Sequence, residues 1–230
     1  MTHISITDEL RDQALVADVR GQGRASVGAH GLQLYLVVKR GLDILGALGG
    51  ILLCLPLWAI MALAIRLDSP GPILFRQRRA GQHGVPFWIL KFRTMYQDAE
   101  ARLNDVLALN KEKNHSLIRI DQDPRVSRVG ALLRALSLDE TPQFINVLKG
   151  EMSLVGPRPI SRPIPDPRGL SRLEARPGLT GLWQISGRKD TDCCFMLEQD
   201  MEYLQRRSLS LDAAIMLATI RALLRRDGAR

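Results

Sequence analysis

The chain has 230 residues, of which 46% are hydrophobic and 24% are charged, so it is long enough for one domain with a substantial core and some appendages. Its net charge of +8 and its pI near 9.9 predict an anionic partner, which could be a nucleic acid, phosphorylated metabolites or an acidic membrane surface. The three cysteines, Cys54 and the adjacent Cys193 and Cys194, exclude a disulfide framework and a spaced metal site and favour a reducing environment.

Residues 1–34 precede the first strongly patterned segment. They mix charges with Gly, Ser and Ala, and they lack the basic region followed by an apolar core that marks a signal peptide. We therefore expect a poorly ordered tail.

Residues 42–65 form an apolar run, LDILGALGGILLCLPLWAIMALAI, whose one charge is Asp43 near its start. Its length matches the ~20 residues that a helix needs to span a bilayer. A buried core helix in a soluble protein fits less well, because an all-round apolar helix of this length rarely fits inside so small a domain. The run predicts a membrane segment.

Two features favour a re-entrant hairpin, although a single span stays open. Pro56 removes a backbone donor inside the run and kinks a helix. A spanning helix usually keeps its Lys/Arg excess on one side, whereas this run has basic residues on both sides. These flanking residues are Lys39, Arg40, Arg66, Arg76, Arg78 and Arg79. We expect a membrane re-entrant hairpin at residues 35–67 and a cytoplasmic catalytic domain at 68–230.

The region that follows predicts short strands and then helices. Residues 73–75 and 87–92 are apolar and aromatic stretches between Pro and Gly, which is typical of short strands or a hairpin. Residues 100–113 indicate an exposed helix, and residues 126–136 repeat apolar side chains at helical spacing.

The last part of the chain adds a loop and a helix. Prolines are too frequent in residues 156–167 for regular structure, while residues 209–226 form an amphipathic helix that could pack on the domain or lie on an anionic bilayer. The predicted fold class is therefore mainly α with a few short β segments (α+β).

Two adjacent carboxylates, Asp139 and Glu140, lie in RALSLDETPQ just before Pro142. Proline favours the first turn of a helix, so Thr141 is a candidate N-cap, while Ser137 with Glu140 also fits a capping box. In either register the pair lies at a helix N-terminus, which favours negative charge and phosphate. The acids could simply cap the helix, or one could attack a substrate while the other holds a metal.

Basic residues in Pro/Gly-rich or short-strand settings flank this pair in the sequence. A diphosphate site with a divalent cation would need arginine forks and a lysine charge, although any one of these residues could be a solvated surface charge. The basic residues are Lys91, Arg93, Arg134, Arg158 and Arg176. Neither a GxxxxGK[ST] loop nor a GxGxxG motif is present, so nucleotide-binding P-loop and Rossmann folds lack their signatures.

The chain from Lys39 to about Leu224 resembles the bacterial sugar transferase family, the monotopic phosphoglycosyltransferases that act on polyprenyl phosphate. The resemblance rests on five motifs in the family's order. They are KRGLDILGA, SPGPILFRQRRAG, FWILKFRTM, DPRVSRVGALLRALSLDETPQFINVLKGEMSLVGPRP and RPGLTGLWQISGR. One departure is Thr141, because the family commonly has Leu before the proline of D-E-x-P-Q.

The resemblance implies a reaction and its residues. Asp139 would attack the β-phosphate linkage of a UDP-sugar, release UMP and carry the sugar-phosphate until undecaprenyl phosphate collects it. Glu140 would join Asp139 in binding or aligning the required Mg²⁺. The phosphates and the nucleotide would be held by basic residues, namely Lys91, Arg93, Arg134 and Arg158.

The resemblance also implies a monotopic phosphoglycosyltransferase fold, with a re-entrant helix broken at Pro56 and a catalytic domain on the cytoplasmic face of the bacterial inner membrane. UDP-glucose and UDP-galactose are the leading donors, followed by UDP-N-acetylhexoses. The product would initiate exopolysaccharide, O-antigen or capsule synthesis. The sequence leaves open a homo-oligomer and polysaccharide-assembly proteins as partners.

Two functions from other classes compete with this one. A membrane-tethered nucleic-acid-binding protein would use the positive charge, but that charge is scattered and aromatic residues are only 5%, so we expect no nucleic-acid partner. A catalytically inactive scaffold of a polysaccharide assembly complex is the second alternative. The joint presence of the predicted site residues argues against it.

Overall fold

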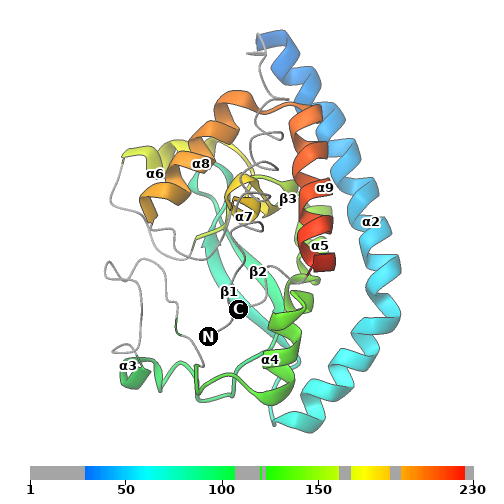
Figure 1. Cartoon of the computed structure of the whole chain (residues 1–230), viewed down its shortest axis with the longest axis vertical. Helices are drawn as coiled ribbons and strands as arrows, with labels where there is room; N and C mark the ends of the chain where they lie inside the picture. The colour runs from blue at the N-terminus through cyan, green and yellow to red at the C-terminus, as the bar shows by residue number, and fades with distance from the viewer. Residues whose placement is uncertain (1–28, 107–119, 121–122, 161–166, 187–192, 226–230) are drawn as a thin grey trace.

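The apolar run forms a single long helix. In the computed structural model, which describes residues 29–106, 120, 123–160, 167–186 and 193–225, helix α2 (Ala29–Asp68) continues through Pro56. Figure 1 shows α2 curving along one side of the domain, so that its two halves run in different directions. Pro56 supplies a physical reason for curvature, because proline lacks the helical N–H and clashes with the preceding turn. By length and composition, α2 could cross a bilayer.

The bounds and the continuity of α2 differ from the prediction. The helix begins at Ala29, inside the predicted tail, whose residues 1–28 lie outside the described part of the chain. The backbone is helical on both sides of Pro56, so the segment does not divide into the two separate helices of a hairpin. The re-entrant arrangement itself stays a prediction.

The domain after α2 is mainly helical and contains two small sheets, as the sequence predicted. Strands β1 and β2 pair antiparallel, and β3 and β4 pair parallel. In chain order, with η marking 3₁₀ helices, the elements are β1 (Leu74–Ala80), η1 (Gln82–Gly84), β2 (Pro86–Phe92), α3 (Leu103–Val106), α4 (Arg128–Ala135), η3 (Leu138–Glu140), α5 (Gln143–Lys149), β3 (Ser153–Val155), α6 (Pro167–Ser171), η4 (Arg172–Glu174), β4 (Gly178–Thr180), α7 (Leu182–Ile185), α8 (Cys193–Arg206) and α9 (Leu209–Arg225).

Helix α2 packs closely on the domain through α4, α5 and β3. A Cβ atom on Gly50 would lie only 2.7 Å from the ring of Phe144 on α5, so glycine permits this approach. Asp43, the one charge in the apolar run, is 3% exposed. Its Oδ1 accepts hydrogen bonds from Ser153 Oγ (3.0 Å) and from the backbone N–H of Leu154 (2.9 Å), so this buried carboxylate has partners on β3.

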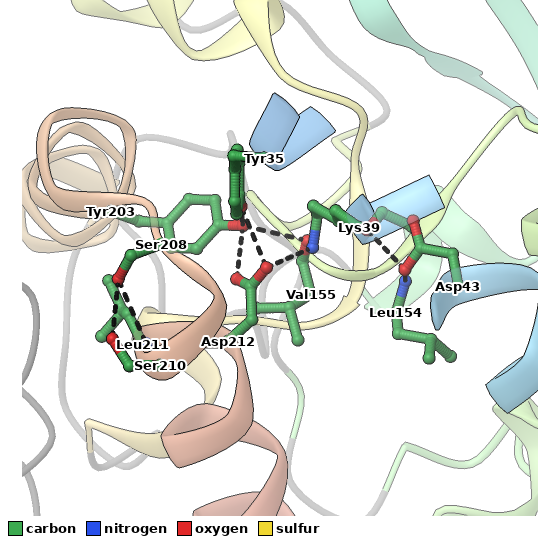
Figure 2. A network of polar contacts seen from close by, with 11 residues as sticks. Tyr35, Lys39, Asp43, Leu154, Val155, Tyr203, Ser208, Ser210, Leu211 and Asp212 are labelled. Carbon is green, nitrogen blue, oxygen red and sulfur yellow. Dashed lines mark hydrogen bonds and ion pairs between the residues drawn. The ribbon is translucent and has the colours of Figure 1, made fainter. Parts of the chain in front are cut away.

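A buried polar network fixes the first part of α2 to α8 and α9 (Figure 2). Asp212 Oδ2 accepts hydrogen bonds from the Tyr35 hydroxyl (2.9 Å) and from Lys39 Nζ (2.8 Å). Asp212 Oδ1 accepts one from the Tyr203 hydroxyl (2.9 Å). Lys39, predicted as a membrane flank, therefore also forms an ion pair with the domain.

Arginines fix α2 to the domain at two further points. Arg40 Nη1 and Nη2 donate to the carbonyl oxygens of Val147 (2.6 Å) and Leu148 (2.8 Å) in the last turn of α5. Just beyond the last turn of α2, Arg93 Nη2 donates to the carbonyl oxygen (2.6 Å) and to Oγ (2.9 Å) of Ser69. Both ends of α2 are thus held by the same domain.

Candidate active site

The two predicted carboxylates lie in η3, a 3₁₀ turn between α4 and α5. Ser137 adopts the left-handed backbone conformation, with φ at 54°, and this residue turns the chain out of α4. Asp139 is buried at 9% exposure, whereas Glu140 is half-buried. The turn therefore presents two neighbouring acids in different environments.

The predicted capping roles around this turn are wrong. The Ser137 side chain forms no capping hydrogen bond, and the N-cap of α5 is Pro142. Thr141 has helical backbone angles, so its hydroxyl turns back and donates to the carbonyl oxygen of Leu138 at 2.8 Å. The carboxylates consequently precede the first residue of α5.

The two carboxylates of the turn have different electrostatic surroundings. Burial, and then the neighbouring Glu140 carboxylate, raise the pKa of Asp139 to about 6, while Lys91 and Arg134 oppose that rise. Lys91 Nζ on β2 donates to Glu140 Oε1 at 2.6 Å. Asp139 is therefore the less solvated of the two acids and is ionised at neutral pH, as a nucleophile requires.

Two predicted phosphate-binding residues, Lys91 and Arg134, reach this pair. The Arg134 Nε donates to Thr94 Oγ1 at 2.8 Å, which orients the guanidinium. These two cations therefore offset the negative charge of Asp139 and Glu140.

The structure does not bring Arg93 and Arg176 to the pair. Arg93 lies just beyond β2 and contacts Ser69 at the end of α2, as described above. Arg176 lines a separate cavity of about 320 Å³ beside the first turns of α2, together with Lys39 and Arg207. A role for Arg93 in phosphate binding stays a prediction.

Arg158 is held by Trp183 and Arg172. Its guanidinium carbon lies 5.2 Å from the centroid of the Trp183 ring, a cation–π contact. Its carbonyl oxygen accepts a hydrogen bond from Arg172 Nη2 (2.6 Å), and Arg172 in turn forms a buried ion pair with Asp200. Because stacking and the backbone contact restrict it, the Arg158 fork is preorganised for a planar or phosphate group.

Arg79 belongs to this site, although in the sequence it stood out only as a basic flank of the apolar run. Burial, and then nearby Arg158, lower its pKa to about 10, while Glu140 opposes this effect, so Arg79 lies within electrostatic reach of both. The β1–β2 register pairs Phe75 with Lys91, which puts Arg79 on the Lys91 face of the sheet. Period-two alternation in β1 is the sequence signal that could have found it.

The carboxylate pair is the candidate magnesium site. In the described part of the chain, no three or more His, Cys, Asp or Glu side chains group in a way that could hold a metal ion. Mg²⁺, however, usually takes one or two protein carboxylates and completes its shell with substrate phosphates and water. The carboxylate oxygens of Asp139 and Glu140 are hard ligands that suit a magnesium ion bound to a diphosphate. Glu140 would then bind both Lys91 and the ion.

Comparisons with known proteins match this chain over most of its length. A model of the bacterial sugar transferase family matches residues 34–226. The chain is 40% identical over 192 residues to the exopolysaccharide production protein ExoY of Rhizobium meliloti (strain 1021), which covers 81% of this chain and 85% of that one.

Two further relatives are named for sugar-phosphate transfer. The UDP-glucose:undecaprenyl-phosphate glucose-1-phosphate transferase of Caulobacter vibrioides is 44% identical over 202 residues, covering 83% of this chain and 71% of the relative. The undecaprenyl-phosphate galactose phosphotransferase of Salmonella typhimurium is 38% identical over 203 residues, and the match covers 84% of this chain. The chain thus spans 41% of the length of the Salmonella protein.

Proposed function

Because the chain belongs to the bacterial sugar transferase family, we propose that it transfers a sugar-1-phosphate from a UDP-sugar to undecaprenyl phosphate and so initiates surface polysaccharide synthesis. Membership makes the chain a transferase of sugar-phosphate groups. The observation that best supports the proposed chemistry is a buried carboxylate, Asp139, among cations that suit phosphates.

The reaction has two displacements at one phosphorus. In the first, a carboxylate oxygen of Asp139 bonds to the phosphorus that carries the sugar, the bond from that phosphorus to the bridging oxygen breaks, and UMP leaves. In the second, a phosphate oxygen of the lipid bonds to the same phosphorus and the carboxylate leaves. Covalent catalysis thus divides one difficult transfer into two easier ones.

The side chains around Asp139 assist both displacements. Lys91, Arg79 and Arg134 supply positive charge where negative charge develops on the phosphoryl oxygens. Arg158 offers a preorganised fork to the nucleotide phosphate. Glu140 is already ion-paired with Lys91, which makes it the aligning acid and leaves Asp139 as the nucleophile.

Magnesium would be held by Asp139 and Glu140 together with the diphosphate of the donor. Once bound, the ion would neutralise phosphate charge and favour departure of UMP.

The location of the acceptor explains the apolar helix. Undecaprenyl phosphate is a membrane lipid, and α2 exposes large apolar side chains such as Leu52 (72% exposed) and Leu53 (83% exposed). Burying such side chains in a bilayer is favourable. We therefore assign α2 to the inner membrane and the catalytic domain to its cytoplasmic face, where nucleotide sugars are available.

Glucose and galactose are the proposed donor hexoses, because relatives carry both sugars in their names. The test is UMP release from a panel of UDP-sugars by protein in nanodiscs with Mg²⁺, with and without undecaprenyl phosphate. Release that depends on the lipid for one sugar supports both the reaction and that donor. Folded protein that releases no UMP from any donor would contradict the proposal and favour the scaffold alternative.

The nucleophile is tested by Asp139→Asn, which should abolish UMP release while the protein still folds. A native pKa near 6, above the usual 3.8, means that the contribution of Asp139 to stability falls as the pH rises from about 4 to about 6. At pH 7 the charged side chain costs up to about 3 kcal/mol. The Tm of the variant should therefore equal or exceed that of the wild type.

The control is Asp98→Asn, at a carboxylate whose side chain is 60% exposed, and it should keep wild-type turnover. Substantial turnover by Asp139→Asn would remove Asp139 from the nucleophile role.

A further inference from the structure

Trp58 on helix α2 hydrogen-bonds to the residue that follows the catalytic turn, Thr141. Its indole Nε1–H donates to Thr141 Oγ1 at 2.9 Å. The same hydroxyl donates to the carbonyl oxygen of Leu138 at 2.8 Å. A continuous chain of two hydrogen bonds therefore runs from the apolar helix into η3, whose remaining residues are Asp139 and Glu140.

Trp58 also contacts the strand that carries the lysine of the site. Its ring meets the ring of Phe92 edge to face, with centroids 6.2 Å apart and planes inclined at 74°. Phe92 follows Lys91 in the chain, and Thr141 follows Glu140. The indole thus contacts the immediate neighbour of each partner in the Lys91–Glu140 ion pair.

Apolar packing alone does not require an indole N–H at position 58. The apolar surroundings of Trp58, which include Met61, Ile65 and Leu133, would accept a phenylalanine or a leucine. An indole in such surroundings needs an acceptor for its N–H, and a leucine at position 141 could not supply one. Thr141 therefore gives the indole N–H of Trp58 its hydrogen-bond acceptor.

We propose that Trp58 is a positioning residue, which holds the Asp139–Glu140 turn in its productive orientation from the membrane helix. The inference rests on the proposed transferase function. Trp58 lies two residues beyond Pro56, so a change in the course of α2 would reach the nucleophile through this contact. Because attack on phosphorus is sensitive to small misplacements of the nucleophile, the effect belongs to kcat.

The test compares Trp58→Phe, which keeps a ring, with Thr141→Val, which keeps the shape of the threonine. Each should lower kcat about three- to ten-fold, the worth of one hydrogen bond, and leave KM for the UDP-sugar nearly unchanged. The double variant should lose no more activity than the more impaired of the two single variants, because Thr141→Val already removes the hydrogen bond that Trp58→Phe removes, together with the bond to Leu138. Trp88→Phe is the matched control, since Trp88 is 56% exposed, and it should keep the wild-type kcat.

A wild-type kcat in both single variants, or losses that multiply in the double variant, would overturn the proposal. A fall in Tm at unchanged kcat would reduce Trp58 to a packing residue and would overturn it equally. The proposed function is tested separately by the wild type: if it releases no UMP, that function fails. The indole N–H resonance of Trp58 still tests the contact, because the Thr141→Val variant must shift it if the hydrogen bond exists.

Discussion

Asp139 must be ionised to attack phosphorus, and burial brings its pKa to about 6, close to working pH. Below that pH the carboxyl is protonated and cannot act as a nucleophile. We expect kcat/KM to rise with pH through an apparent pKa near 6 and to level off above about pH 7. Initial rates of UMP release between about pH 5 and about pH 8 measure this profile, and a flat profile would contradict it.

Asp200 provides the necessary control, because burial also raises its pKa to about 6, with Arg172 opposing the rise. Asp200 contacts Arg158, through the backbone N–H of Arg158 and through Arg172, and not the carboxylate that attacks. Asp200→Asn should therefore lower the rate and keep the shape of the profile. If the rise near pH 6 vanished in this variant, Asp200 would be the group that titrates.

A variant of Arg79 tests whether the face of the β1–β2 sheet that carries Lys91 and Arg79 binds the UDP-sugar. Arg79→Gln should lower kcat/KM for the UDP-sugar by about 10- to 100-fold, the worth of a hydrogen bond to a charged group. Arg78→Gln is the matched control on the next residue of β1, whose side chain is exposed, and it should have little effect. Equal kinetics for the two variants would remove Arg79 from the site.

At the scale of elements, the contact between α2 and α5 depends on the absence of a side chain at one helical position. A Cβ on Gly50 would lie within 2.7–2.8 Å of three atoms of the Phe144 ring, whereas a Cβ on Gly49 would have nothing within 4 Å. Gly50→Ala should therefore destabilise the protein by about 1–3 kcal/mol through overpacking. Gly49→Ala should be neutral or stabilise it by up to about 1 kcal/mol, because alanine favours helix.

Thermal unfolding in one detergent measures both glycine variants. The sign of the difference matters more than its size. If Gly49→Ala lowers the Tm as much as Gly50→Ala does, then the two helices do not pack as closely as the structure has them.

Regular spacing of apolar residues predicted the elements well, because burial acts on whole faces. Strand β2 and helices α4 and α9 lie within two residues of their predicted bounds, but β1 extends to Ala80, five residues beyond the predicted stretch, and α8 was not predicted. Single polar side chains were harder to predict. Thr141 looked like a cap, yet Pro142 takes that position and the hydroxyl of Thr141 bonds Leu138 and Trp58, a partner 83 residues away that only the fold brings near.

The sequence predicted the types of side chain in the candidate site better than it predicted which arginines lie there. Asp139, Glu140 and Lys91 lie close together, while their roles in the reaction stay predictions. Arg79 was missed since its place depends on strand register, and Arg93 contacts the end of α2 because the chain leaves β2 just before it. Side-chain direction at such positions follows from tertiary structure.

At the scale of the whole molecule, both ends of α2 bind one domain. Near its start, Tyr35 and Lys39 hydrogen-bond to Asp212 (Figure 2), and just past its end Ser69 is bound by Arg93. A spanning helix would separate its ends by a hydrocarbon layer about 30 Å thick. A domain that holds both ends would then have to extend through the bilayer with its charged side chains, at a high cost.

The arrangement therefore favours a helix that enters the bilayer and returns to the same face, with its outward apolar side chains in the lipid. We expect reporters fused at the N-terminus and at the C-terminus both to lie on the cytoplasmic side. Paired fusions of a phosphatase, active only outside the cytoplasm, and a fluorescent protein, active only inside, measure this. Reporters on opposite sides would mean that α2 spans the bilayer, and the contacts of Tyr35 or of Arg93 with α2 and the domain could not both form in the membrane.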